Sequence, residues 1–152
     1  MEYREEPRHS EPLVGAMIRG RISRVLPALD ALWVDYGAEA PGFLPVGEVT
    51  EESLAAVGAS GSKAGNLKKG QEILVQVTKL PVGSKGARLT GRFSLPGRYW
   101  VYLPCGAPEI LVARKLGSKD VRAKLRETYE PTLEGSGGLV LRSTAPIDSP
   151  LD

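Results

Sequence analysis

The side chains of this chain that could take part in chemistry are suited to binding rather than to cleavage. The sequence has one cysteine, Cys105, and one histidine, His9. Neither a nucleophile–histidine pair nor a zinc site made by the protein alone is therefore expected. Asp30 and Asp35 are explained by a turn and a strand, and neither paired acids at catalytic spacing nor a glycine-rich phosphate loop is found. We expect no catalytic residue and no metal ligand here, with an enzyme in its own right kept as the alternative.

Two kinds of side chain remain that could recognise a ligand. Aromatic residues lie in strand-like segments, and alternation along residues 31–36 sets Trp33 on the face opposite to Leu32 and Val34. Lysines and arginines are the other kind, with 20 of them against 18 acidic residues. The formal net charge of +2 is mild. It permits an anionic partner, so the positions of the charges must decide whether there is one.

Length and composition indicate a globular protein. The chain has 152 residues, 41% of them apolar, which is enough for one medium domain or two small ones with a core that needs no disulfide. Eighteen glycines and 12 prolines predict many turns and short elements. No apolar run approaches about 18 residues, and residues 1–12 lack the apolar part of a secretory signal. We expect no membrane span and, with a lone thiol, a cytoplasmic protein.

The first part of the chain reads as a small β domain over residues 13–95, after an exposed arm at 1–12. Thr50 is the predicted N-cap of one short helix, at 51–57. The segments that the pattern predicts are strands at 14–26, 31–36, 42–46, 72–80 and 87–95, a flexible loop at 58–70 and a turn at 81–86. Five short strands with a helix between the third and fourth favour a closed or nearly closed barrel. A two-sheet sandwich is the alternative.

The second part, residues 96–145, reads as a separate small α+β unit. Val121, Leu125 and Tyr129 recur every four residues behind a predicted N-cap at Ser118, which indicates a helix that Pro131 ends. Strands are predicted at 98–103, 110–114 and 138–144, giving the order β-β-α-β. Residues 146–152 are expected to be a disordered tail.

Several ordered blocks of the sequence resemble the ribonuclease E/G family. They are 20–27 (GRISRVLP), 31–39 (ALWVDYGAE), 42–45 (GFLP), 70–79 (GQEILVQVTK), 85–90 (KGARLT), 94–99 (SLPGRY) and 138–143 (GLVLRS). The resemblance covers residues 14–145. It implies a mainly β protein: a five-stranded OB-fold barrel of the S1 type, followed by a small unit that senses a 5′-monophosphorylated RNA end.

The resemblance also implies what the rest of the family's chain supplies. Members of the family are magnesium-dependent endoribonucleases, which are hydrolases that act in RNA processing and mRNA decay. Its catalytic aspartates and zinc-linking cysteines belong to later parts that are not found here. Mg²⁺ and structural Zn²⁺ are therefore implied only for the full-length enzyme, and this chain alone is expected to be inactive. We expect a monomer, against a homo-oligomer for the full-length enzyme.

For the barrel, the resemblance implies an RNA-binding face. Its rings are Trp33 and Phe43, which Tyr36 could join, and a ring exposed on a strand can stack on any base. Its cations are Lys79, Lys85 and Arg88, which would contact phosphates without reading sequence. The alternative is that the rings are core residues and that the lysines are solvated.

For the second unit, the resemblance implies a 5′-phosphate site made by Gly97, Val101, Arg142 and Ser143. A guanidinium fork can pair two phosphate oxygens, a hydroxyl can donate, and Val101 would close the pocket. A register slip of one residue would make Thr144 the equivalent hydroxyl. We therefore expect single-stranded RNA binding with 5′-monophosphate recognition. The alternative is a general S1-type RNA-binding module without end sensing.

Overall fold

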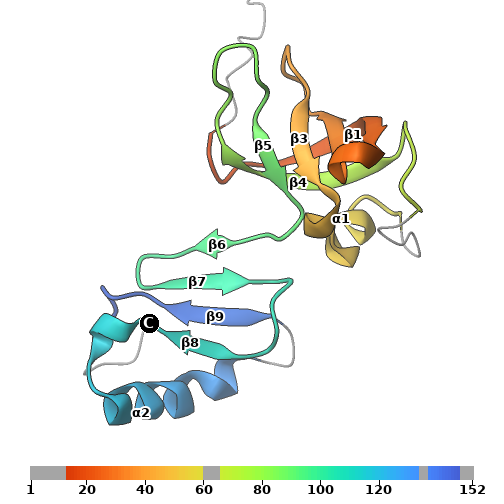
Figure 1. Cartoon of the computed structure of the whole chain (residues 1–152). Coiled ribbons are helices and arrows are strands. Elements are labelled where there is room, and N and C mark those ends of the chain that lie inside the picture. Colours follow the sequence, from red (N-terminus) through yellow and green to blue (C-terminus); the bar gives the residue numbers. More distant parts are fainter. Residues whose placement is uncertain (1–12, 60–65, 134–136, 148–152) are drawn as a thin grey trace, which may run out of the picture. The chain divides into compact units, whose positions relative to one another are not determined.

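A computed structural model of the chain describes residues 13–59, 66–133 and 137–147. The predicted arm at 1–12, part of the predicted loop at 58–70 and most of the predicted tail lie outside the described residues. The chain forms two compact units, residues 1–91 and residues 92–152 (Figure 1).

The first unit is a closed β-barrel with the strand order β1-β2-β3-β5-β4. Its elements are β1 (Met17–Leu26), η1 (Pro27–Leu29), β2 (Ala31–Asp35), β3 (Gly42–Pro45), η2 (Val46–Glu48), α1 (Glu51–Ala55), β4 (Glu72–Lys79) and β5 (Arg88–Thr90). All neighbouring strands run antiparallel except β3 and β5, which are parallel. Five strands closed in this order, with a helix between the third and fourth, form an OB-fold barrel. The predicted fold is confirmed, and the sandwich alternative is wrong.

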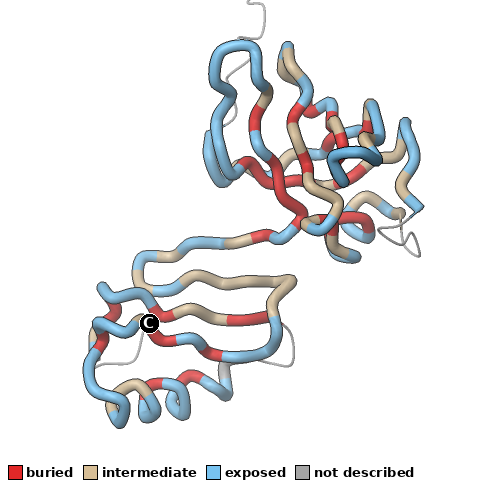
Figure 2. The backbone as a smooth tube through the Cα atoms, in the orientation of Figure 1, coloured by how far each residue is buried: buried red, intermediate tan, exposed pale blue. Residues whose placement is uncertain are grey.

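The core of the barrel is made by alternate residues of its strands. Ile22, Leu32, Val34 and Leu44 are fully buried, because side chains one position apart point to opposite faces. Figure 2 shows the buried residues of this unit, in red, mostly along the strands of the barrel.

Helix α1 is fastened to the barrel at its N-terminus, where the predicted cap is confirmed. Thr50 and Ser53 form a capping box, in which each hydroxyl accepts from the backbone N–H of the other residue. The Thr50 hydroxyl also donates to the carbonyl of Gly91 at 2.7 Å, which ties the helix to the end of β5.

The fifth strand, β5 (Arg88–Thr90), is shorter than the predicted 87–95, because the residue that follows it bonds to Glu48. At Gly91 the chain leaves the barrel sheet, and the Gly91 N–H donates to the Glu48 carbonyl at 2.9 Å. A side chain there would begin 2.6 Å from that oxygen. Of the rest of the predicted strand, only Leu95 is in a strand, and it begins β6 (Leu95–Pro96) of the second unit.

The second unit is a four-stranded sheet with the order β6-β7-β9-β8. Its other elements are β7 (Trp100–Leu103), β8 (Ile110–Val112), η4 (Arg114–Leu116), α2 (Lys119–Tyr129), η5 (Glu130–Thr132) and β9 (Gly138–Leu141). Helix α2 connects the parallel strands β8 and β9, and its Leu125 and Tyr129 join Leu141 in the core. Ser118 caps this helix as predicted. The unit has one strand more than the predicted β-β-α-β order, because the two-residue β6 carries too little pattern to be seen in the sequence.

Tyr36 is a core residue, which corrects the expectation that it could stack on RNA. Only 7% of it is exposed. Alternation from Trp33 explains this, because a residue three positions further along the strand lies on the opposite, inward face. The Tyr36 hydroxyl accepts a hydrogen bond from the backbone N–H of Ala87 at 3.3 Å. Tyr36 thus holds the start of β5 from inside the barrel.

We predict that Tyr36→Phe lowers the free energy of unfolding of the barrel by about 1–3 kcal/mol, the usual cost of leaving a buried donor unpaired. Urea unfolding followed by fluorescence measures this in a Trp100→Phe background, which leaves Trp33 as the single tryptophan. Tyr99→Phe, in the second unit, is the control and should leave the curve unchanged. Equal curves for Tyr36→Phe and its background would show that the hydroxyl contributes nothing.

Candidate nucleic-acid interface

Trp33 and Phe43 lie side by side on the outer face of the barrel. They are directly opposite each other in the β2–β3 pair. Their ring centroids are 5.7 Å apart at an interplanar angle of 74°, an edge-to-face contact. Both are half-buried, while Leu32, Val34 and Leu44 beside them point inward. Edge-to-face packing fixes the two rings and leaves part of their surface accessible.

Two of the predicted basic residues continue this pair across the barrel. Arg88 on β5 is the register partner of Phe43, and its guanidinium carbon is 5.8 Å from the centroid of the Phe43 ring. Lys79 on β4 is in turn the register partner of Arg88. Both cations are exposed. The structure therefore brings four predicted residues together in one row that crosses β2, β3, β5 and β4.

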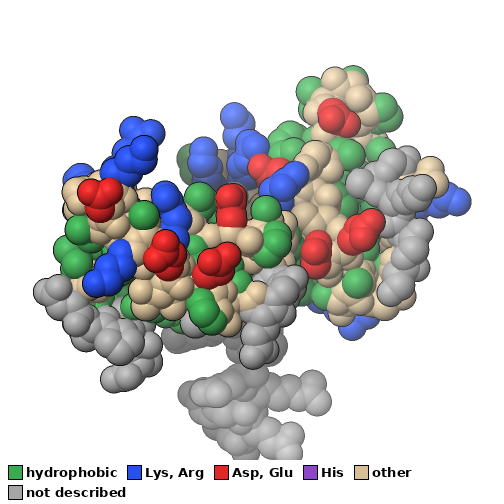
Figure 3. All heavy atoms as spheres, turned by 90° about the horizontal axis from the view of Figure 1, so that it is seen from below, with side chains coloured by type: hydrophobic (Ala, Val, Ile, Leu, Met, Phe, Trp, Pro, Cys, Tyr) green, Lys and Arg blue, Asp and Glu red, His purple; other side chains and the backbone are tan. Residues whose placement is uncertain are grey.

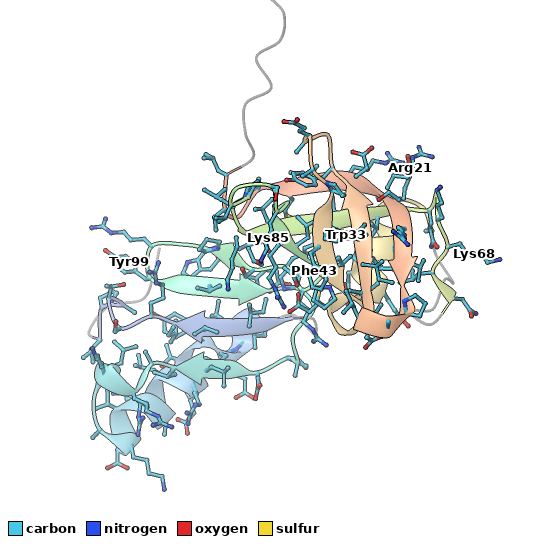
Figure 4. All side chains as sticks on the ribbon, turned by 45° about the horizontal axis from the view of Figure 1, so that its top comes forward. Arg21, Trp33, Phe43, Lys68, Lys85 and Tyr99 are labelled. Carbon is cyan, nitrogen blue, oxygen red and sulfur yellow. The ribbon has the colours of Figure 1, made fainter. Side chains whose placement is uncertain are left out.

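Lys85 is positioned by the turn between β4 and β5. The backbones of Val82 and Lys85 exchange hydrogen bonds of 3.2 and 3.0 Å. After this turn, the backbone of Gly86 passes so close to Pro41 that a side chain at 86 would begin 1.8 Å from the Pro41 carbonyl oxygen. The Ala87 carbonyl then accepts from the Phe43 N–H at 2.8 Å. Figure 4 shows Lys85, Phe43 and Trp33 following one another across the barrel.

One further side chain of this face was not predicted from the sequence. Arg24 on β1 is the register partner of Trp33. Strict alternation from the buried Ile22 would send Arg24 into the core, but the register shifts between these two residues. The only feature of the sequence that indicated an outward Arg24 was its charge, because a charged side chain is almost never fully buried without a partner.

Charge is distributed unevenly along β1. Glu72 forms ion pairs with both Arg19 and Arg21. The hydrogen bond from Arg19, with the positive charges of Arg19 and Arg21, holds the pKa of the Glu72 carboxyl below its ordinary value. Over the residues that the structure describes, Arg24 and Lys85 have no ion-pair partner. On the face drawn in Figure 3, by contrast, acidic and basic side chains are interspersed.

In the second unit, predicted residues meet at the turn between β6 and β7. Arg142 donates from Nη1 to the carbonyl of Gly97 at 3.2 Å, and its backbone N–H donates to the carbonyl of Tyr99 at 2.8 Å. The Thr144 hydroxyl donates to the carbonyl of Arg98 at 3.2 Å. Three successive turn carbonyls thus fix the segment that follows β9.

The remaining predicted residues of this cluster differ in their surroundings. Val101 is half-buried on β7, beside Val140 of β9 in the pairing register. Ser143 and Thr144 are both exposed, and it is the Thr144 hydroxyl that is hydrogen-bonded to the turn. A side chain at Gly97 would begin 2.8 Å from the indole of Trp100. The Trp100 ring therefore occupies the space where a side chain at residue 97 would begin.

A cavity elsewhere in the second unit contains none of the predicted site residues. Its volume is about 430 Å³, and it is lined by Pro108, Glu109, Ile110, Leu111, Arg126, Glu130 and Leu133. None of the helices that the structure describes is long and apolar enough to span a membrane.

Comparison with known proteins shows a sequence relationship that covers most of this chain. It is 33% identical to ribonuclease G of Escherichia coli K12 over 139 residues, which is 88% of this chain and 28% of that protein. It is 35% identical to ribonuclease E of the same organism over 143 residues, which is 91% of this chain and 13% of that protein. The chain thus spans less than a third of either relative. The resemblance read from the sequence is confirmed as a family relationship.

Two further comparisons add less. No protein-family model matches the sequence. A solved structure, that of an uncharacterised protein of Methanocaldococcus jannaschii, is similar over 53% of this chain and 92% of its own, with 15% identity and a TM-score of 0.41.

We predict that Gly86→Ala destabilises the barrel by about 1–3 kcal/mol, the range found for overpacking, because the β4–β5 turn must move away from Pro41. Thermal unfolding measures the loss. Gly47→Ala is the matched control, since a side chain at 47 meets nothing within 4 Å. If both variants unfold like the parent chain, the close approach of residues 86 and 41 does not exist in solution.

Proposed function

Because this chain is related in sequence to the ribonuclease E/G family, we propose that it binds single-stranded RNA through the outer face of its barrel and recognises a 5′-monophosphate through its second unit. The observation that carries the first half is the row of Trp33, Phe43, Arg88 and Lys79 across four neighbouring strands. Aromatic rings with cations beside them on one face are an arrangement that binds single-stranded nucleic acid.

On the barrel face, the rings and the cations have separate tasks. A base stacks on the accessible surface of Trp33 or Phe43, and each such contact is worth about 1–3 kcal/mol. Arg88, Lys79 and Lys85 attract the phosphates between the bases without reading sequence. A duplex buries the faces of its bases, so this mode favours unpaired RNA.

In the second unit, Arg142 is the residue that would bind a terminal phosphate. Its hydrogen bond to the Gly97 carbonyl uses one of the five guanidinium N–H groups, so the others can donate to phosphate oxygens. The Arg142 side chain is exposed, which allows a ligand to reach it. Ser143 offers an exposed hydroxyl beside it, Thr144 holds the segment to the turn, and Val101 limits the space for a bulkier triphosphate.

We further propose that this binding serves a magnesium-dependent endoribonuclease of RNA processing and decay, acting in the cytoplasm. We assign the metal chemistry to residues other than those that the structure describes. Among the described residues, no group of three or more His, Cys, Asp or Glu side chains lies close enough to hold a metal ion. The part of this chain in the reaction is to hold and orient RNA.

For the barrel, we predict that Trp33→Ala weakens binding of a 5′-hydroxyl RNA of about ten nucleotides by about fivefold to a hundredfold, the loss of one stacked base. Fluorescence anisotropy of labelled RNA measures the dissociation constant. Leu29→Ala, an exposed apolar residue of the same unit that is outside the row, is the control. Undiminished affinity in the Trp33 variant would contradict binding by the barrel face.

For the second unit, we predict that a 5′-monophosphate improves binding over a 5′-hydroxyl and that Arg142→Ala removes only this advantage. A lost charged hydrogen bond costs about 1.5–3 kcal/mol, or roughly ten- to a hundredfold. The same anisotropy assay compares the two RNAs, with Arg126→Ala on α2 as the control for charge. If the parent chain binds both RNAs equally, the chain is an S1-type binding module without end sensing.

A further inference from the structure

We propose that Arg24 is a further RNA-binding residue, which contacts the phosphate next to the base stacked on Trp33. This inference rests on the proposed RNA binding by the barrel face. It goes beyond that proposal by extending the binding row onto β1.

A β-bulge places Arg24 in the row. Ile22 pairs with Val34 and Arg24 pairs with Trp33, so Ser23 is an extra residue in β1. An extra residue changes the phase of alternation by one, which turns the Arg24 side chain outward to the face of Trp33. The Ser23 hydroxyl donates to the Trp33 carbonyl at 3.2 Å, which holds the bulge at this position.

A second β-bulge lies at the other end of the row, in β4. Val77 pairs with Leu89 and Lys79 pairs with Arg88, so Thr78 is the extra residue of β4. The Thr78 hydroxyl donates to the Arg88 carbonyl at 3.1 Å.

Both bulges bring a cation to the outer face beside the row. The result is one line of register partners on five successive strands: Arg24, Trp33, Phe43, Arg88 and Lys79. It has cations at both ends and rings in the middle.

This order places a cation on either side of the two rings, where the phosphates that flank a stacked nucleotide would lie. Neighbouring strands are about 4.8 Å apart, so a cation one strand away from a ring reaches the backbone of a nucleotide stacked on that ring. RNA that follows the line passes Arg88 and Lys79 on one side of the rings and Arg24 on the other.

Arg24 is also available for such a contact. It is exposed, and within residues 13–59, 66–133 and 137–147 it has no ion-pair partner. Arg21, three positions earlier on the same strand, is also exposed but is paired with Glu72. The two arginines therefore differ in position and pairing and not in charge, which makes Arg21 the matched control.

The test is a salt titration of binding to the same 5′-hydroxyl RNA, which leaves the 5′-phosphate site out of the measurement. For Arg24→Gln we expect affinity about threefold to tenfold weaker at low salt, and a plot of log K against log salt that is shallower by about 0.7, the value for one phosphate contact to a single strand. Arg21→Gln, which removes the same charge, should change the slope by less. Arg24→Lys should keep the parent slope, since it keeps a cation at this place. Urea unfolding of each variant checks the fold.

The outcomes separate this inference from the proposed function. If Arg24→Gln and Arg21→Gln behave alike while Trp33→Ala weakens binding, the barrel face binds RNA and Arg24 has no special part in it. If Trp33→Ala binds RNA like the parent chain, the proposed barrel interface is wrong, and so is the proposed role of Arg24. A slope that is reduced in Arg24→Gln and restored in Arg24→Lys supports the inference.

Discussion

The structure of the first unit depends on the closure of the barrel between β3 and β5, where the strands pair over a single register position. The contacts that make this closure gather around Ala87. Its carbonyl accepts from the Phe43 N–H, its own N–H donates to the Tyr36 hydroxyl, and Gly86 before it packs against the Pro41 carbonyl. Without this junction β3 and β5 would be open edges. The same junction sets Phe43 beside Arg88 and fixes the turn that carries Lys85, so the contacts that close the barrel also assemble the face that we propose binds RNA.

Where the period of the sequence persists, the fold and the site could be predicted. Alternation in residues 31–36 correctly predicted that Leu32 and Val34 point inward and Trp33 outward. The same rule, applied three residues beyond Trp33, accounts for the burial of Tyr36. Prediction failed where the period breaks. The bulge at Ser23 reverses the phase of β1 and presents Arg24, but a bulge is decided by the register of the partner strand, which one segment of sequence does not contain. The end of β5 was misplaced for a similar reason, because the contact that ends it, from Gly91 to Glu48, joins residues far apart in the chain.

The second unit shows a different limit of sequence reasoning. Helix α2 was predicted closely, since its cap at Ser118 and its four-residue repeat are local signals. Which hydroxyl after Arg142 faces the β6–β7 turn is a question of one residue in register: the sequence favoured Ser143, with Thr144 as the alternative if the register slipped by one residue. The structure assigns the turn contact to Thr144, because the carbonyls of residues 97–99 fix the path of this segment. Ser143 lies exposed next in sequence to Arg142, whose guanidinium is held by its hydrogen bond to Gly97.

The small net charge bears on how such a protein would select RNA. With 20 basic and 18 acidic residues, the overall field attracts polyanions only weakly. Where ion pairs form, as at Glu72, cations are neutralised by the protein itself. In the proposed binding mode, affinity comes from the few places where unpaired cations adjoin accessible rings, and stacking on a ring requires a base that is not already paired. On this surface the preference for single strands would follow from geometry and not from charge, because a duplex could use the cations but not the rings.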